Sequence, residues 1–129
     1  MDTNKRLLIV DENFKRMEES LADSLKNRGI DLTVASNGDE AYALISAGKF
    51  DLVIVDIGLN CCKDTDWYAE MAVEWVRGIR KRDETVKIIV LNNWLLHDEA
   101  YIKAAGADAY FTKPIDWKEY VLKPLGIPC

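Results

Sequence analysis

Long hydrophobic runs are absent from this sequence. The longest stretch without an acidic, basic or histidine residue covers the nine residues from Ile88 to Leu96, whereas a helix that spans a bilayer needs about 20 apolar residues. The N-terminal segment MDTNKRLLIVDE contains neither a long apolar segment nor a signal-cleavage site. We therefore expect a cytoplasmic protein that neither spans a membrane nor is exported.

Residues that build disulfide, zinc and nucleic-acid sites are scarce. The three cysteines, Cys61, Cys62 and Cys129, are an odd number and two are adjacent, a pattern that argues against a disulfide framework and favours ordinary reduced thiols. The single histidine, His97, cannot complete a four-ligand zinc site. Lysine and arginine number 17 against 22 acidic residues, a net charge of −5, which argues against a dedicated nucleic-acid partner.

Short apolar runs alternate with amphipathic stretches along the 129 residues, a length typical of one domain over residues 1–129. Because the runs are apolar throughout, they predict strands covered on both faces, as in a parallel sheet. The expected fold is therefore α/β, a doubly wound five-stranded parallel sheet with helices on both faces. Strands are expected at 7–10, 32–35, 51–56, 87–91 and 108–112, and helices at about 14–25, 41–45, 67–79, 97–105 and 116–123.

Polar residues stand at the carboxyl ends of four expected strands, where ligands bind in such sheets. Asp11-Glu12 ends the first, Asp56 the third, Asn92 the fourth and Lys113 the fifth. Clustered carboxylates repel one another unless they share a cation, and a hard ion such as Mg²⁺ suits an all-oxygen site. A lysine opposite can neutralise a phosphoryl oxygen, so the set suits phosphoryl transfer to a carboxylate.

The competing interpretation is that Asp11 and Asp56 only form turns at strand ends, where aspartate is common. That interpretation accounts for one aspartate more easily than for acids ending two strands together with a lysine-proline pair after a third. The joint pattern favours a chemical site.

Three segments resemble a known family. LLIVDEN, DLVIVDIG and AGADAYFTKPI are similar to the signature segments of response-regulator receiver domains of two-component signalling, in the right order, and the resemblance extends from about Lys5 to Lys123. It implies a flavodoxin-like fold of the receiver type.

The resemblance also implies roles for individual residues. Asp56 would accept a phosphoryl group from a histidine kinase or a phosphotransfer protein. Asp11, Glu12, Asp56 and the backbone carbonyl of Gly58 would hold Mg²⁺, and Lys113 would contact the phosphoryl group.

Two further positions match the family pattern. The Lys113–Pro114 peptide bond would be cis, an uncommon geometry even for proline. Tyr110 matches the aromatic residue whose inward or outward rotamer reports activation.

The chain departs from the family pattern in several places. Asn92 stands where Thr or Ser is usual, and Glu12 where Asp is more frequent. The loop at about 57–66, with Cys61-Cys62, is enlarged. Pro124 is expected to end the last helix early and leave a short tail at 124–129, which weakens the case for a dimer through that helix and leaves the oligomeric state open.

Three functions are compatible with these residues. The leading hypothesis is a stand-alone receiver, a signalling switch rather than an enzyme, whose output goes through an unknown protein in trans or through phosphorelay. The alternative is a receiver-like adaptor that acts independently of phosphorylation, which Asn92 and the enlarged loop favour. A metal-dependent phosphatase is disfavoured, because that class usually carries a second acid where Gly58 stands.

Overall fold

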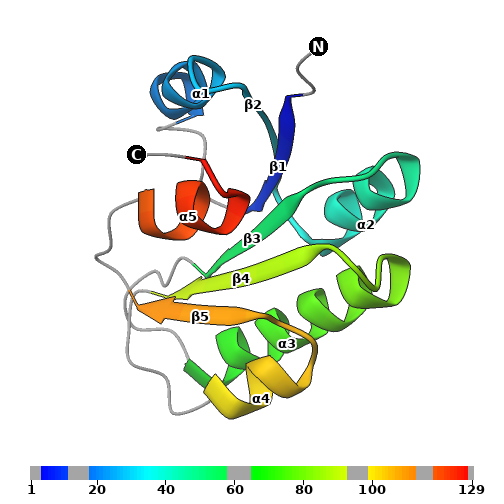
Figure 1. Cartoon of the computed structure of the whole chain (residues 1–129). Coiled ribbons are helices and arrows are strands. Elements are labelled where there is room, and N and C mark those ends of the chain that lie inside the picture. The colour runs from blue at the N-terminus through cyan, green and yellow to red at the C-terminus, as the bar shows by residue number, and fades with distance from the viewer. Residues whose placement is uncertain (1–3, 12–17, 58–64, 93–98, 113–117, 128–129) are drawn as a thin grey trace.

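The fold is a five-stranded parallel sheet between two layers of helices (Figure 1). The computed structural model describes residues 4–11, 18–57, 65–92, 99–112 and 118–127. The strand order is β2-β1-β3-β4-β5, which confirms the predicted doubly wound α/β architecture. The strands are β1 (Lys5–Val10), β2 (Ile30–Ala35), β3 (Leu52–Ile57), β4 (Lys87–Asn92) and β5 (Ala109–Thr112).

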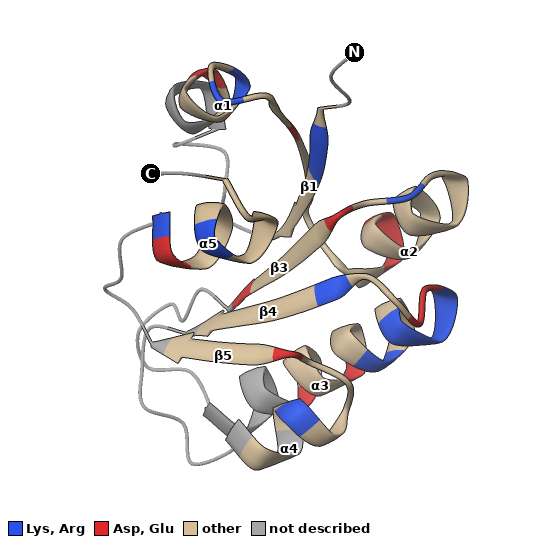
Figure 2. Ribbon diagram, in the orientation of Figure 1, with Lys and Arg blue, Asp and Glu red and all other residues tan. Residues whose placement is uncertain are grey.

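Both faces of the sheet carry a hydrophobic core, because successive side chains of a strand point to opposite faces. In β1, Leu8 and Val10 belong to one buried cluster, and Leu7 and Ile9 belong to the other. The strands are accordingly apolar over most of their length, and the charged residues lie mainly at strand ends and on helices (Figure 2). This two-sided burial is why the strands are apolar throughout instead of alternating.

The helices divide between the two faces. Those that contribute buried residues to the cluster with Leu8 and Val10 are α2 (Gly38–Ala47), α3 (Thr65–Arg82) and α4 (Glu99–Ala104). The opposite face is covered by α1 (Glu18–Lys26) and by the π-helix η2 (Lys118–Leu122), which runs into α5 (Lys123–Leu125). No helix in the described part of the chain has the length and apolar character needed to cross a bilayer.

Several element boundaries differ by a few residues from those predicted. Of the loop predicted at about 57–66, Ile57 belongs to β3 and α3 begins at Thr65; residues 58–64, with Cys61 and Cys62, lie outside the described residues. Pro124 does not end the last helix, which continues to Leu125. Pro124 is therefore the second-last residue of this helical segment, which ends one residue after it.

Helices α2 and α3 pack through an aromatic side chain that lies over a glycine. The Tyr42 ring occupies the space that a Cβ at Gly78 would fill. Its hydroxyl donates to the Glu74 carbonyl oxygen at 3.2 Å, and the Arg82 guanidinium lies 4.3 Å from the ring centroid. Burial of the ring, with a smaller contribution from the Glu74 carboxylate, raises the pKa of the Tyr42 hydroxyl.

We expect Gly78→Ala to lower the free energy of unfolding by about 1 kcal/mol or more, because the added methyl group displaces the Tyr42 ring. Helix propensity alone predicts the opposite sign, a gain of up to about 1 kcal/mol. Urea unfolding measures the difference, with Lys81→Ala at an exposed position of the same helix as the control. A more stable Gly78→Ala variant would contradict this description of the packing.

The turn between α3 and β4 is organised by one carboxylate. Asp83 Oδ1 accepts hydrogen bonds from Thr85 N at 2.9 Å, Thr85 Oγ1 at 3.0 Å and Val86 N at 3.1 Å. These bonds favour the ionised form and hold the pKa of Asp83 below its ordinary value, the Thr85 N–H contributing most.

Because the pKa of Asp83 is lower in the folded state than in the unfolded state, its stabilising effect is present above its ordinary pKa of 3.8. The effect is lost as the pH falls through the lowered pKa. We expect Asp83→Asn to flatten the acidic limb of the stability curve, measured by urea unfolding between pH 5 and pH 2. An unchanged slope in this variant would contradict the assignment.

Candidate phosphorylation and metal site

Two aspartates lie side by side at the carboxyl edge of the sheet. Strands β1 and β3 are neighbours, and Val10 is paired with Val55. Asp11 follows Val10, and Asp56 follows Val55. The register therefore brings these two predicted site residues together. Among the residues whose side-chain burial is described, they are the only buried charged ones, each 8% exposed.

The backbone holds both aspartates firmly. The N–H of Asp11 donates to the Ala35 carbonyl oxygen at 2.9 Å, which extends the β1–β2 ladder by one residue. Asp56 is within β3 and is paired with Leu91 of β4. Sequence reasoning did not identify Ala35 as a support of the site, because no single sequence reveals which carbonyl pairs with which N–H.

The donor set fits a hard cation. Two carboxylates removed from water at neighbouring positions repel each other, and a divalent ion that both contact offsets that repulsion. Mg²⁺ is typically held by one or two carboxylates with water completing its shell. The other two predicted ligands, Glu12 and Gly58, lie outside the described residues, and no group of three His, Cys, Asp or Glu occurs within the described ones.

Asn92, which is predicted to contact the phosphoryl group, lies in the backbone at the same edge of the sheet. Asn92, the last residue of β4, is paired with Ile57, which follows Asp56, and with Thr112, which precedes Lys113. Because β3, β4 and β5 are parallel and paired in this register, their carboxyl ends lie at the same edge of the sheet. Lys113 and Pro114 lie outside the described residues, so their contacts and the peptide bond between them stay predictions.

Tyr110, the predicted switch aromatic, lies on β5 two residues before the end of that strand. Its partly buried side chain packs against the core cluster under α3 and α4. A side chain in this place can respond to rearrangement of α4, because both contact the same cluster.

Comparison with known proteins identifies the family. The family model described as the response regulator receiver domain matches residues 7–123. The chain belongs to the response regulator receiver domain family. This confirms the resemblance inferred from the three sequence segments.

Individual relatives agree with this membership. The probable transcriptional regulator ycf29 of Porphyra purpurea is 30% identical over 117 residues, 88% of this chain and 52% of that protein. The response regulator protein TrrA of Thermotoga maritima, solved in complex with Mg²⁺ and BeF, is 32% identical with a TM-score of 0.65 over 93% of this chain and 98% of that chain.

A response regulator protein of Burkholderia pseudomallei was solved with a phosphorylated aspartic acid, a calcium ion and citrate. It is 28% identical, with a TM-score of 0.74 over 95% of this chain and 66% of that chain. The receiver domain described here spans about half the length of the curated relatives that it matches.

If Asp11 and Asp56 share a cation, Mg²⁺ should raise the thermal midpoint of the wild-type receiver domain. When the free ion concentration is about 100 times the dissociation constant, binding stabilises the folded state by about 2.7 kcal/mol. We expect Asp11→Asn to abolish most of this gain in a thermal melt. Asp51→Asn, which changes an exposed aspartate at the other end of β3, is the matched control. Equal gains in all three proteins would contradict the site.

Proposed function

We propose that this receiver domain is a phosphoacceptor switch of a two-component pathway, with Asp56 as the acceptor. The observation that supports the proposal most is the burial of Asp56 beside Asp11, at the strand ends where this fold binds its ligands. Because Asp56 is 8% exposed, phosphoryl transfer to it would require a donor that reaches the carboxyl edge of the sheet.

The proposed donor is a phosphohistidine of a histidine kinase or a phosphotransfer protein. In the transfer, the P–N bond of the phosphohistidine breaks and a P–O bond to the Asp56 carboxylate forms, while the imidazole leaves and takes up a proton. Lys113 would neutralise the charge on the phosphoryl oxygens, and Asp11, Glu12 and the Gly58 carbonyl would join Asp56 in holding Mg²⁺. The ion, when bound, would supply positive charge to the transferring group.

Two relatives support this assignment by analogy. One was solved with Mg²⁺ and BeF and another with a phosphorylated aspartic acid and calcium, and both are more than 25% identical to this chain. For the present chain, we propose the same class of chemistry at Asp56, and an output by contact with a further protein.

A second candidate function is an adaptor whose binding does not depend on phosphorylation. Asn92 favours it, because an amide stands at the end of β4 where the family usually has a hydroxyl. The amide can still donate a hydrogen bond, but it is longer and differently shaped than a hydroxyl. The adaptor hypothesis therefore predicts a protein without a conformational response at this position.

Acetyl phosphate with Mg²⁺ should add one phosphoryl group to the wild-type protein, seen by intact mass. Asp56→Asn should not be labelled, whereas the control Asp51→Asn should be labelled as the wild type is. Tryptophan fluorescence with beryllofluoride measures the response in the same proteins. Labelling that persists in Asp56→Asn would place the acceptor elsewhere, and labelling without any response would favour the adaptor.

A further inference from the structure

Helices α2 and α3 each place an aromatic side chain over a glycine of the other. Tyr42 of α2 lies over Gly78 of α3, as described above. In the reciprocal contact, the indole of Trp75 in α3 lies over Gly38, the first residue of α2. A Cβ at Gly38 would be 2.5 Å from Trp75 Cδ1 and 2.6 Å from Nε1, and Trp75 is only 8% exposed. The indole therefore fixes the place where α2 begins.

The turn that precedes Gly38 is short and hydrogen-bonded. The N–H of Glu40 donates to Asn37 Oδ1 at 2.9 Å, and the Glu40 carboxylate accepts from the N–H of Ser36 at 2.8 Å. Both bonds satisfy backbone donors at the start of the helix. Only Ser36 and Asn37 separate Gly38 from Ala35, the last residue of β2. A displacement of Gly38 is therefore passed to Ala35, because no long loop absorbs it.

Ala35 is the residue that holds the backbone of Asp11. Its carbonyl oxygen accepts from the N–H of Asp11 at 2.9 Å, and it is paired with Val10 at the end of β1. Trp75, Ala35 and Val10 belong to the same buried cluster. Protein cores are close-packed, so neighbouring side chains respond to a change in the volume of one of them. The connection from Trp75 to Asp11 thus runs through the start of α2, the turn before it and the end of β2.

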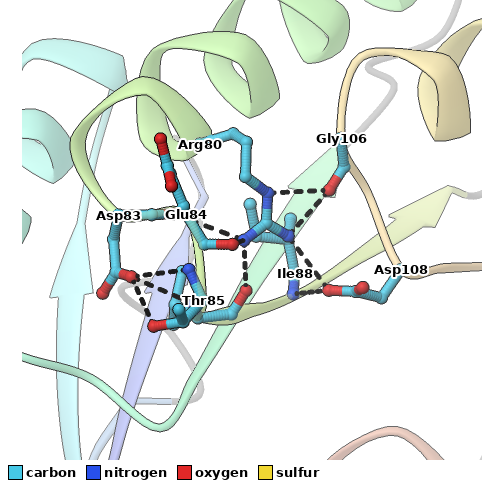
Figure 3. Close-up of polar contacts among 8 residues, drawn as sticks. Arg80, Asp83, Glu84, Thr85, Ile88, Gly106 and Asp108 are labelled. Atoms are coloured by element: carbon cyan, nitrogen blue, oxygen red, sulfur yellow. Dashed lines mark hydrogen bonds and ion pairs between the residues drawn. The ribbon is translucent and has the colours of Figure 1, made fainter.

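The C-terminal end of α3 is held separately, by Arg80 (Figure 3). This side chain donates from Nε and Nη2 to the Gly106 carbonyl oxygen at 3.1 and 2.8 Å, and its Nη2 lies 3.1 Å from Asp108 Oδ2. Its Nη1 donates to three carbonyl oxygens of the turn after α3, those of Asp83, Glu84 and Val86. These contacts join α3 to the beginnings of β4 and β5. The stability of this end of α3 can therefore be changed at a distance from Asp11.

We propose that Trp75 is a positioning residue for the cation site, because it seats the start of α2 and so keeps the Ala35 carbonyl where it orients Asp11. This inference rests on the proposed function, in which Asp11 and Asp56 hold Mg²⁺. That ion demands nearly ideal octahedral geometry, with ligand distances of about 2.0–2.1 Å. Removal of a group that orients a metal ligand commonly lowers metal affinity roughly 10- to 100-fold. A small displacement of Asp11 would therefore weaken binding.

Isothermal titration calorimetry with Mg²⁺ tests the proposal. We expect Trp75→Leu to raise the Mg²⁺ dissociation constant about tenfold, because loss of the indole lets the start of α2 shift. Trp75→Phe keeps an aromatic ring and should be intermediate. The matched control is Ile79→Ala, which opens a cavity in the same cluster one helical turn closer to Arg80. It should lower stability and leave the dissociation constant unchanged.

Amide hydrogen exchange provides a readout that does not require the ion. The N–H of Asp11 that donates to Ala35 should exchange roughly tenfold faster in Trp75→Leu than in Ile79→Ala. The two variants are compared at temperatures where their free energies of unfolding are equal, so that a general loss of stability does not contribute. Equal exchange rates at Asp11 would overturn the proposal.

Gly38→Ala tests the same contact from the other helix. Its methyl group displaces the Trp75 indole, so this variant should also bind Mg²⁺ more weakly. In the Trp75→Leu background the substitution should add little further loss, because the ring that it displaces is gone. Fully additive losses would contradict a role for this contact. If Trp75→Leu does not fold, Gly38→Ala and Trp75→Phe still decide.

The outcomes separate this inference from the proposed function. Absence of Mg²⁺ binding by the wild-type protein would overturn both the cation site and the role of Trp75. Binding by the wild type, with the same dissociation constant in Trp75→Leu and Ile79→Ala, would overturn the role of Trp75 alone.

Discussion

Asp11 and Asp56 put two carboxylates next to each other in a buried place, and the rest of the fold can be understood from that arrangement. Ionised groups removed from water need a compensating positive charge or hydrogen bonds to remain there. The pairing of Val10 with Val55 fixes the two side chains at one edge, and apolar strands packed on both faces keep that register from slipping. Under the proposed function, a divalent cation bound between these two carboxylates would offset their mutual repulsion.

The architecture and the place of the site could be predicted because both follow from simple chain physics. Continuous apolar runs indicate strands covered on both faces, and parallel strands bring their carboxyl ends to one edge. Asp11 and Asp56 could therefore be placed together without a structure. The boundaries were harder: Thr65 begins α3 inside a stretch without clear periodicity, and the helix that Pro124 was expected to end continues to Leu125.

The hydrogen bonds from Arg80 to the Gly106 carbonyl oxygen could not be predicted from the sequence, and the reason is physical. Arg80, Lys81 and Arg82 are three successive basic residues in the last turn of α3, where positive charge is common because it complements the helix dipole. Gly106 looks like an ordinary helix stop. Arg80 differs from its neighbours because its guanidinium donates to the carbonyl oxygen of Gly106, 26 residues away. That contact depends on how α3 and α4 pack, which local sequence patterns do not encode.

The strand order also constrains how the chain folds as it is synthesised. Strand β1 is made first, yet both of its neighbours, β2 and β3, follow it in the sequence. From β3 onward the sheet grows in one direction, toward β4 and then β5. Arg80 is therefore in place before Gly106 and Asp108 exist, and its hydrogen bonds to them form only after α4 has been made. A nascent chain that stops short of α4 and β5 would carry Arg80 without its partners Gly106 and Asp108, and would leave an exposed edge on β4, a condition that favours association with other chains.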